Sequence, residues 1–501
     1  MSPLSRRTLI AAGLVGAGAT VLTATSAQAV AYPFTLGVAS GEPAADGFVI
    51  WTRLAPNPLA ANGLGGMSSA SVAVEWQVAE DDRFTTITRT GTFTAVQAAA
   101  HSVHVELSGL QPGREYFYRF RAQGHISPVG RALTTPTTGS SLTMLFASCS
   151  HYEAGYFTAY RRMAEEHPHL ILHLGDYIYE GAASSTQVRR HAPTVEIDDL
   201  ADYRVRHAQY KTDPDLQAAH AIAPWAVVWD DHEVENNYAN LVRNDSSPAG
   251  DFRARRAAAY KAYWEHMPLR SAQAPVAENM QLYRRVRWGN LATFHLLDTR
   301  QYRDDQACGD GTKVCPEADS PTRTLTGAAQ EAWLLDGLRQ KLGTWDFLGQ
   351  QVFFAQKLAS ADGAKSMDSW DGYTANRDRL QRGWDAAGLR NTVVLTGDVH
   401  RSWASNLMLD YDAQDRIVGT ELVTTSVTSG GDGNAADTGT SPLNPHVKFH
   451  KNLRGYVRTV TTPAQVSVDF RCVDKVTVRD YPVKTVQSYA IEAGNPGLQA
   501  P

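Results

Sequence analysis

The stretch LILHLGDYIYEG, residues 170–181, changes character half-way along. Its first half is an apolar run typical of a strand buried on both faces. Its second half carries Asp176 and Tyr179, three residues apart. A strand that brings Asp176 to the edge of a sheet and then turns once directs Tyr179 to the same point. A carboxylate and a phenol can then share one ligand; the alternative is that Tyr179 is a packed aromatic with a hydrogen-bonded hydroxyl.

Further apolar runs of the same kind follow along the chain. Between them lie amphipathic runs typical of helices, at residues 156–167 and 327–342. This alternation predicts an α/β domain over residues 137–501, with a mainly buried β core flanked by helices. Besides residues 169–176, the expected strands are residues 142–148, 224–231, 291–299, 351–357 and 392–398.

Residues 30–136 have a different pattern. Alternating or β-branched and aromatic segments at 48–54, 71–79, 101–107 and 114–122 are separated by Gly, Pro and Asp turns, which predicts an all-β module. Leu110 and Pro112 lead to Tyr116 in the manner of the tyrosine corner of a β-sandwich. The module resembles a fibronectin type III domain, and we expect it to serve as a packing or spacer unit. The polar segment 134–141 links it to the next domain.

The N-terminus resembles a twin-arginine export signal. Arg6 and Arg7 precede a mild apolar run at residues 9–22, and AQA at 27–29 has the small residues of a signal-peptidase site. The run is too short for a membrane span, and the rest of the sequence has no segment apolar enough to cross a bilayer. The resemblance implies a bacterial protein that the twin-arginine machinery exports already folded and often metal-loaded. We therefore expect residues 1–29 to be removed and the mature protein to be secreted.

The charge balance excludes one class of partner. Removing residues 1–29 takes away two arginines and no acidic residue, which leaves 45 basic and 52 acidic residues and a net charge of −7. A nucleic-acid-binding protein held by bulk charge would be basic. A local basic patch remains compatible with this composition.

The chain has four cysteines. Cys308 and Cys315 enclose a Gly-containing loop, which predicts a local disulfide in an exported protein. Cys149 and Cys472 remain. They can pair with each other, but Cys149 stands at a strand end among candidate ligands, so we favour two free thiols, or one free thiol and one metal-bound.

Residues that bind metals recur where the predicted strands end. A single Asp at such a place is usually a turn or helix-cap residue. Four clusters at four strand ends favour a site instead, because ligands collect at the carboxyl ends of strands in open α/β sheets. The clusters are Cys149; Asp176 with Tyr179; Asp230, Asp231 and His232; and Asp398 with His400.

The residue types in these clusters suggest two different cations. Tyrosine ionises near pH ~10, so binding by Tyr179 points to a strongly Lewis-acidic trivalent ion, Fe³⁺, to which Cys149 and His400 also offer ligands. Asp231 and Asp398 are hard oxygen donors suited to Ca²⁺ or Mg²⁺. Asp176 has two oxygens and can bridge both. Two cations about 3.5–4 Å apart can clamp a phosphate and lower the pKa of a bound water.

Four motifs in order carry a resemblance to a known family. They are FASCS (146–150), GDYIYE (175–180), WDDHEVENNY (229–238) and GDVHRSW (397–403). Together they resemble the alkaline phosphatase D (PhoD) family of calcineurin-like metallophosphoesterases, over nearly the whole mature chain.

The resemblance implies a role for each matching residue. Cys149, Asp176, Tyr179 and His400 would bind iron. Asp231 and Asp398 would bind the second metal, which the family associates with calcium; Mg²⁺ or Mn²⁺ is less favoured. His232 would contact the phosphate or the leaving group, so Asp231 and His232 are the expected catalytic residues.

Other assignments rest on fewer residues. Asn236 and Asn237 follow this segment, and either can help the second site or the substrate, or cap a helix. Arg300 follows a strand and can bind substrate; the alternative is a surface salt bridge. His151 is close to Cys149 and can support the ligands from behind.

The resemblance therefore implies an exported metal-dependent phosphoester hydrolase, an alkaline phosphatase or phosphodiesterase. The alternative is a phospholipase D of the same family that hydrolyses phospholipid head groups. A non-catalytic binding module built on the sandwich would leave the clustered ligands unexplained.

Overall fold

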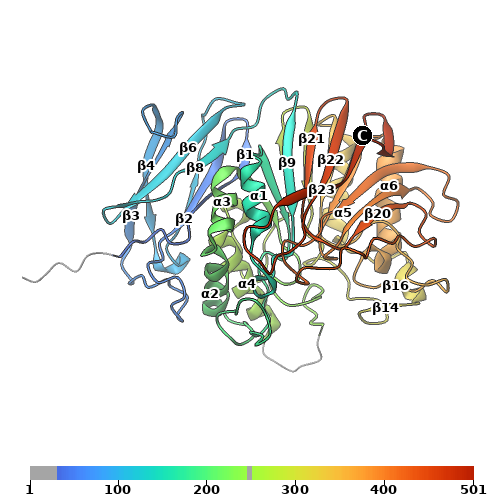
Figure 1. Cartoon of the computed structure of the whole chain (residues 1–501), viewed down its shortest axis with the longest axis horizontal. Coiled ribbons are helices and arrows are strands. Elements are labelled where there is room, and N and C mark those ends of the chain that lie inside the picture. Colours follow the sequence, from blue (N-terminus) through green and yellow to red (C-terminus); the bar gives the residue numbers. More distant parts are fainter. Residues whose placement is uncertain (1–30, 245–250) are drawn as a thin grey trace, which may run out of the picture. The chain divides into compact units, whose positions relative to one another are not determined.

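The computed structural model describes residues 31–244 and 251–501. The expected export signal at residues 1–29 lies outside the described residues. Two large sheets dominate the described chain (Figure 1). The first has ten strands, in which the neighbours β9, β10, β11 and β1 run parallel and the others antiparallel. Its order is β24 (Asn495–Gln499), β23 (Val483–Glu492), β22 (Gln465–Val473), β21 (Arg454–Thr461), β9 (Leu142–Ala147), β10 (Leu170–Leu174), β11 (Pro224–Val228), β1 (Val38–Ala44), β2 (Gly47–Arg53) and β5 (Ser102–Glu106).

The second large sheet has seven strands, with four parallel strands at its centre, β13, β15, β17 and β19. Its order is β12 (Arg284–Trp288), β13 (Ala292–Leu296), β15 (Trp345–Gly349), β17 (Thr392–Thr396), β19 (Ile417–Val423), β18 (Ser402–Met408) and β20 (Val447–Lys451). A short ribbon pairs β14 (Thr312–Lys313) with β16 (Lys365–Ser366).

Helices cover the outer faces of both sheets. One hydrophobic core contains side chains of both large sheets, such as Phe146 and Phe294, together with residues of the first four helices. A second core joins the seven-stranded sheet to the last two, through residues such as Leu338 and Trp384. The layers are therefore helix, sheet, sheet, helix, as the α/β interpretation requires. The helices are α1 (Thr158–Glu165), α2 (Leu200–Lys211), α3 (Pro214–Ile222), α4 (Phe252–His266), α5 (Gly327–Arg339) and α6 (Thr374–Ala386).

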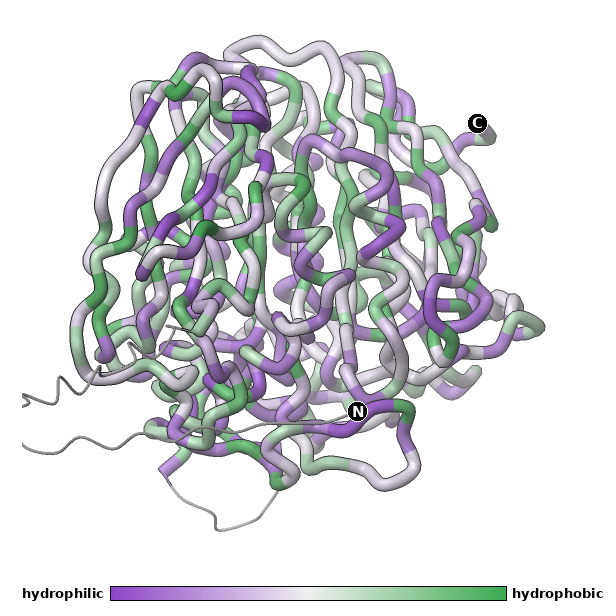
Figure 2. The backbone as a smooth tube through the Cα atoms, turned by 60° about the vertical axis from the view of Figure 1, so that its left-hand side comes forward, coloured by the Kyte–Doolittle hydropathy of each residue, from purple (hydrophilic) through white to green (hydrophobic). Residues whose placement is uncertain are grey.

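Hydrophobic stretches recur along the whole described chain, shown in green on the tube in Figure 2. Continuous burial along β10 and β11 explains their mainly apolar sequences, because each lies between two layers. Within the described residues, none of the helices combines the length and apolarity that crossing a membrane requires.

The predicted strand at residues 351–357 is wrong. The strand of this region is β15, Trp345–Gly349, and the apolar run after it is a buried loop. The N–H groups of Phe354 and Ala355 donate to the carboxylate of Glu421 at 2.7 and 2.9 Å. The side chain of Gln350 bonds to Thr396 at 2.6 Å. Side chains therefore satisfy the polar backbone that a sheet would otherwise have paired.

The N-terminal module has the expected β content but shares a sheet with the following domain. A separate five-stranded sheet packs on β1, β2 and β5 around a core of its own. The N–H of Gln111 donates to the hydroxyl of Tyr116 at 3.0 Å, which is the bond of a tyrosine corner. Because β1 pairs with β11 in parallel, these strands extend the large sheet. The strands of this five-stranded sheet are β4 (Ile87–Ala95), β3 (Val72–Ala79), β6 (Glu115–Ala122), β7 (His125–Ile126) and β8 (Gly130–Leu133).

Candidate metal centre

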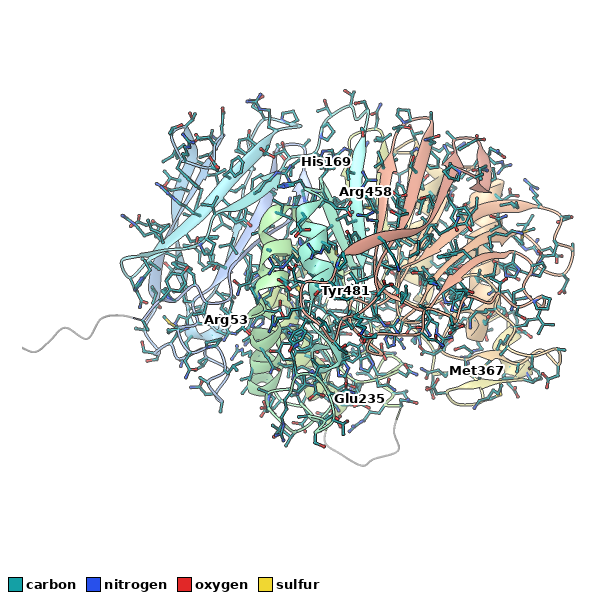
Figure 3. The ribbon with its side chains drawn as sticks, viewed as in Figure 1. Arg53, His169, Glu235, Met367, Arg458 and Tyr481 are labelled. Carbon is teal, nitrogen blue, oxygen red and sulfur yellow. A yellow bond between two sulfur atoms is a disulfide. The ribbon has the colours of Figure 1, made fainter. Side chains whose placement is uncertain are left out.

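The candidate ligands lie in loops after β9, β10, β11 and β17. These loops come from two sheets and support one another: the N–H of Cys149 donates to Gly175 O at 3.1 Å, and Ser148 pairs with Ser426 in an isolated bridge. The parallel strands therefore deliver their ends to one place. Figure 3 labels Glu235, which belongs to the segment after β11 that also carries Asp231 and His232.

A first group combines a thiol, a carboxylate, an imidazole and a phenol. Ligand atoms of Cys149, Asp176 and His400 all lie within 4.8 Å of one another. The hydroxyl of Tyr179 donates to Asp176 Oδ2 at 2.8 Å, and His400 Nε2 lies 3.1 Å from that hydroxyl. The spacing of Asp176 and Tyr179 thus brings both side chains to one point, as the sequence predicts.

A second group shares one member with the first. Asp176, Asp231 and His232 also offer ligand atoms within 4.8 Å of one another. Asp176 Oδ1 and Asp231 Oδ1 are buried and have no hydrogen-bond partner among the described residues, although the Arg300 guanidinium forms a longer ion pair with Asp231 Oδ1 at 3.4 Å. Asp398 faces the same charges, since burial and then the acids Asp230, Asp368 and Asp231 raise its pKa. Unpaired buried carboxylate oxygens are costly in an apoprotein, and a bound cation satisfies them.

The backbone at these residues is strained. Cys149, Asp176, Asp398 and His400 have φ values of 60°, 54°, 64° and 55°. Residues other than glycine rarely adopt this left-handed region, and each costs of order 1–3 kcal/mol. Such strain persists only where the surrounding structure enforces it, and here four of the candidate ligands share it.

The electrostatics of the group favour a cation. Burial and the neighbouring acids Asp231 and Asp230 raise the pKa of Asp176 well above its ordinary value. Burial, followed by the charge of Asp176, raises the pKa of the Cys149 thiol and of the Tyr179 phenol. Each group would therefore hold its proton until a positive charge enters. Thiol, phenol, imidazole and carboxylate together fit metal ions as ligands.

Arg300 lies beneath this centre. It is fully buried, so a surface salt bridge is excluded. Its Nε donates to Asp230 Oδ1 at 2.5 Å, and its two other nitrogens donate to both oxygens of Asp368 at 2.8 and 2.9 Å. Its nearest approach to Asp231 is 3.4 Å. The expected substrate contact therefore needs correction, because carboxylates already occupy the donors of this guanidinium.

Two glutamates that the sequence analysis did not single out hold the site in place. Glu233 accepts the N–H groups of Asp176, Tyr177 and Asp230 at 3.1, 2.5 and 2.8 Å, so it ties the loops after β10 and β11 together. Glu180 accepts from His232 Nδ1 at 2.7 Å. Both lie inside the quoted motifs, but neither position says which atoms it would reach.

His232 is oriented toward the centre by this bond. Burial alone would lower its pKa, but Glu180, Asp231 and Asp176 outweigh that effect and raise the pKa well above the ordinary value. Its ring lies 4.2 Å from the ring of Tyr179. With Nδ1 bonded to Glu180, the other ring nitrogen is available to the ligand of the site.

The two asparagines behave differently from each other. No helix begins at this point of the described chain, so the helix-cap alternative is wrong. Asn236 is exposed, and its N–H donates to Glu180 Oε1 at 2.7 Å. Asn237 donates its N–H to Asp231 Oδ2 at 2.6 Å and its side-chain amide to Asp310 at 2.7 Å. Asn237 therefore connects the centre to the loop that contains Asp310.

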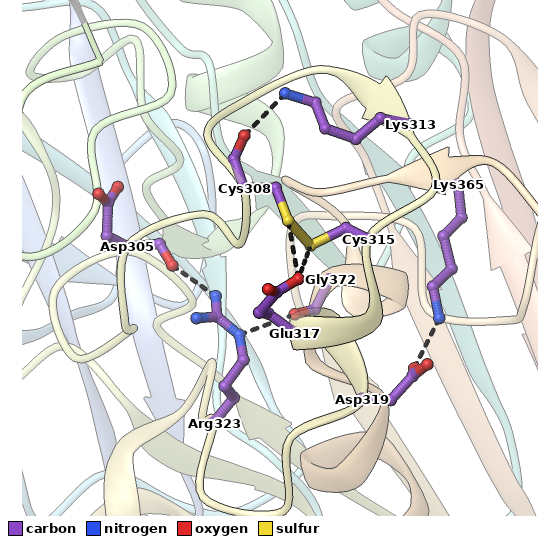
Figure 4. Close-up of a disulfide and its surroundings, with 9 residues drawn as sticks. All are labelled: Asp305, Cys308, Lys313, Cys315, Glu317, Asp319, Arg323, Lys365 and Gly372. Atoms are coloured by element: carbon purple, nitrogen blue, oxygen red, sulfur yellow. Dashed lines mark hydrogen bonds and ion pairs between the residues drawn. A yellow bond between two sulfur atoms is a disulfide. The ribbon is translucent and has the colours of Figure 1, made fainter.

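That loop is closed by a disulfide between Cys308 and Cys315 (Figure 4). The carboxylate of Glu317 lies 3.1 Å from the sulfur of Cys308, but neither sulfur carries a proton or a free thiolate, so this group cannot hold a metal. Cys149 and Cys472 are free and buried. The structure therefore excludes a bond between them and leaves Cys149 available as a ligand.

His151 packs beside the centre, with its ring 4.6 Å from that of Tyr179. It also approaches Glu153 and His191, but this trio lacks the free donors of a metal site. Glu153 accepts the N–H of Ser184 and of His191, and the two nitrogens of His191 contact Gly181 O and the Tyr210 hydroxyl. His151 is left as a support behind Tyr179.

The comparisons with known proteins agree with this geometry. The family model of the PhoD-like phosphatases matches residues 144–470, and the model of their N-terminal domain matches residues 19–136. The chain belongs to the PhoD-like phosphatase family. It is 49% identical over 483 residues to alkaline phosphatase D of Bacillus subtilis (strain 168), covering 93% of this chain and 82% of that protein.

A solved structure of PhoD has the same fold. It superposes with a TM-score of 0.90 at 49% identity and covers 94% of this chain and 92% of that one. As a PhoD-like phosphatase, the chain is a phosphoric ester hydrolase. The resemblance inferred from four short motifs is thereby confirmed.

Proposed function

We propose that this phosphatase works with a pair of unlike cations, Fe³⁺ and Ca²⁺. The observation that carries the proposal is the position of Asp176. It belongs to both ligand groups, and one of its buried oxygens has no protein partner among the described residues. A shared carboxylate of this kind is suited to bridging two ions.

The two groups differ in chemistry, which supports unlike ions. Cys149, Tyr179 and His400 would hold Fe³⁺ together with Asp176, because a phenol with a raised pKa needs a strongly Lewis-acidic ion to lose its proton. Asp231 and Asp398 would hold Ca²⁺, for which carboxylate oxygens are the usual ligands; Mg²⁺ and Mn²⁺ are less favoured. When bound, such a pair supplies Lewis acidity for activating water and neutralising phosphate charge.

The residues of the chain would orient the reaction. In hydrolysis, a water oxygen bonds to phosphorus while the bond to the ester oxygen breaks, and that oxygen takes up a proton. His232, held through Nδ1 by Glu180, presents its other ring nitrogen to the centre. There it would hold a phosphate oxygen in the transition state or protonate the departing oxygen. We favour the first role, because bound cations can already stabilise the leaving group.

We also propose that the enzyme is exported through the twin-arginine pathway and acts outside the cell. The paired Arg6 and Arg7 before an apolar run support this, and so does the disulfide, which is typical of oxidising compartments.

Elemental analysis of protein purified without added metal tests the cation pair. We expect iron and calcium, and a visible charge-transfer band from the Tyr179 phenolate that Tyr179→Phe abolishes or shifts. A calcium chelator should stop turnover and Ca²⁺ should restore it. Colourless, iron-loaded and active wild type would exclude the tyrosine–iron assignment, and activity without divalent ions would exclude the pair.

Substrate choice is tested at one enzyme concentration with a chromogenic phosphomonoester, a phosphodiester and a choline phospholipid. A phosphatase or phosphodiesterase should hydrolyse the first two faster. Faster hydrolysis of the phospholipid would favour the phospholipase D alternative.

A further inference from the structure

A basic pocket adjoins the metal centre on the side of His400. Its volume is about 500 Å³, and it opens between the loop after β17 and the segment that leads into β21. We define the basic pocket by its polar and aromatic lining other than His400: Lys357, Arg401, Trp403, Asn434, Asn452 and Arg454. The lining that the structure describes contains three cationic residues and no carboxylate.

Lys357 has no bonded counterion among the described residues. No described residue gives its ammonium a hydrogen bond or an ion pair; its nitrogen lies 5.3 Å from the ring centre of Trp403 and 5.7 Å from that of Phe353. Burial lowers the pKa of Lys357, although Asp371 acts in the opposite direction. A half-buried ammonium ion without an acceptor is costly, and an anion in the pocket would offset that cost.

Arg454 is buried and bonds to neutral acceptors. Its nitrogens donate to the carbonyl oxygens of Gly431, at 2.8 Å, and of His400, and to Asn452 Oδ1 at 3.1 Å. Burial lowers its pKa to about 10. These bonds hold the loop that carries His400 but leave the positive charge without a hydrogen-bonded carboxylate among the described residues. Arg300, by contrast, bonds to two acids.

Arg401 is the third cationic residue of the basic pocket. It is exposed, and it approaches Asp437 at 3.6 Å, a distance at which the pair is weak. Asp437 is also bonded to Asn452 at 3.0 Å. The guanidinium of Arg401 therefore remains able to bind an anion in the pocket.

We propose that the basic pocket binds a second phosphate group of the substrate while the scissile phosphate lies at the metal centre. His400 belongs to both, because it is a candidate metal ligand and also lines the pocket. One molecule that carries two phosphates can therefore reach both. The proposal rests on the proposed function, since it places the reacting phosphate at the cations.

The positive charge of the basic pocket favours phosphate groups and disfavours cationic substrate groups. A phosphate carries roughly −1.5 to −2 charge near neutral pH and offers several acceptor oxygens, which match the donors of Lys357 and Arg401. A cationic group such as choline would meet like charges there, and such contacts reduce affinity for the wrong partner. The preferred substrates are thus phosphoesters with a second anionic phosphate a few bonds from the first.

A matched pair of substrates tests the proposal at fixed free calcium. Propane-1,3-diyl bisphosphate and 3-hydroxypropyl phosphate differ only in the second phosphate. We expect wild type to show a kcat/KM about tenfold higher for the bisphosphate, the scale of one charge-assisted contact. Lys357→Gln and Arg401→Gln should each reduce this ratio, and together should bring it close to one. Lys448→Gln, an exposed lysine outside the pocket, is the matched control and should leave the ratio unchanged.

Binding gives a second measurement that does not need turnover of the test compound. Propane-1,3-diyl bisphosphonate should inhibit hydrolysis of a chromogenic monoester more strongly than propylphosphonate does, and Lys357→Gln should remove that difference. Equal ratios for wild type and Lys357→Gln, or an equal effect of Lys448→Gln, would overturn the subsite. Wild type that hydrolyses both substrates without preference also overturns it but leaves the proposed function intact. Hydrolysis of neither substrate by protein loaded with both iron and calcium would instead count against the proposed function, the cation pair.

Discussion

The metal centre and the basic pocket lie on either side of His400, and one gathers acidic side chains while the other gathers basic ones. At the centre, Asp176, Asp231 and Asp398 converge, and Arg300 offsets only part of their charge. In the pocket, Lys357 and Arg454 have no bonded carboxylate among the residues described. Each region therefore requires a ligand of opposite sign, a cation in one and an anion in the other.

The two regions also differ in how they are built. The carboxylates of the centre are held by a buried network in which Glu233 and Arg300 bond to the ligand loops. The cations of the pocket are held by carbonyl groups and aromatic faces. The buried network of charges holds the metal ligands in fixed positions. The weakly paired cations of the pocket can still bind anionic groups of different substrates. Removing one residue of the metal centre should therefore reduce activity more than removing one residue of the basic pocket.

The largest expected effect follows the loss of the shared carboxylate. Asp176→Asn removes the ligand common to both groups and should lower kcat/KM on a chromogenic monoester by on the order of 10⁴-fold or more, since the members of such a unit act together. Iron and calcium content measured by elemental analysis should fall with it. Asp410→Asn, an exposed carboxylate, is the control. Full metal content and activity in Asp176→Asn would contradict a shared bridge.

Arg300 is next. Arg300→Met leaves Asp230 buried without its cation, whereas Asp368 keeps Arg303, and removing one partner of a buried ion pair typically costs about 3–5 kcal/mol of unfolding free energy. Urea unfolding of the metal-depleted protein measures this. Arg339→Met removes an arginine from an exposed pair with Asp336 and should have a far smaller effect. Equal losses in the two variants would show that the charges at the centre need no internal counterion.

His232→Ala should keep its iron and calcium and slow turnover by about 10²–10³-fold, the scale of one lost transition-state contact. If His232 holds the phosphate, alkyl and nitrophenyl esters should slow alike. If it is the acid, alkyl esters should slow much more, because their leaving oxygen is more basic. Loss of metal, or near-wild-type rates on both esters, would exclude the role.

The smallest expected effect is at the disulfide loop. Replacing Cys308 and Cys315 by serine opens an eight-residue loop and should lower the free energy of unfolding by at most about 2.5 kcal/mol. Because Asp310 of this loop holds Asn237, which in turn bonds to Asp231, affinity for the second cation should weaken as well. Calcium titration of the activity measures the weakening; an unchanged midpoint would show that the loop and the centre are independent.

Much of the fold and most of the candidate ligands could be predicted from local sequence. The strands that end at Cys149, Asp176 and Asp398 are short apolar runs whose burial is visible in their composition. Residues 351–357 contain an equally apolar run at 352–355 and are not a strand, because Glu421 takes the N–H groups that a neighbouring strand would have paired. Apolar composition reports burial, but it does not report the hydrogen-bond partner.

The sequence by itself determined which side chains reach the ends of the buried strands, because strand pattern and the Asp–Tyr spacing are properties of adjacent residues. Only the tertiary structure decided that Arg300 neutralises acids rather than binding substrate, that β1 extends the catalytic sheet, and that Lys357, Arg401 and Arg454 form one pocket. These outcomes depend on charges and backbone groups far apart in the chain. Their energies arise when burial removes water and brings them within a few ångströms, which happens after the chain has folded.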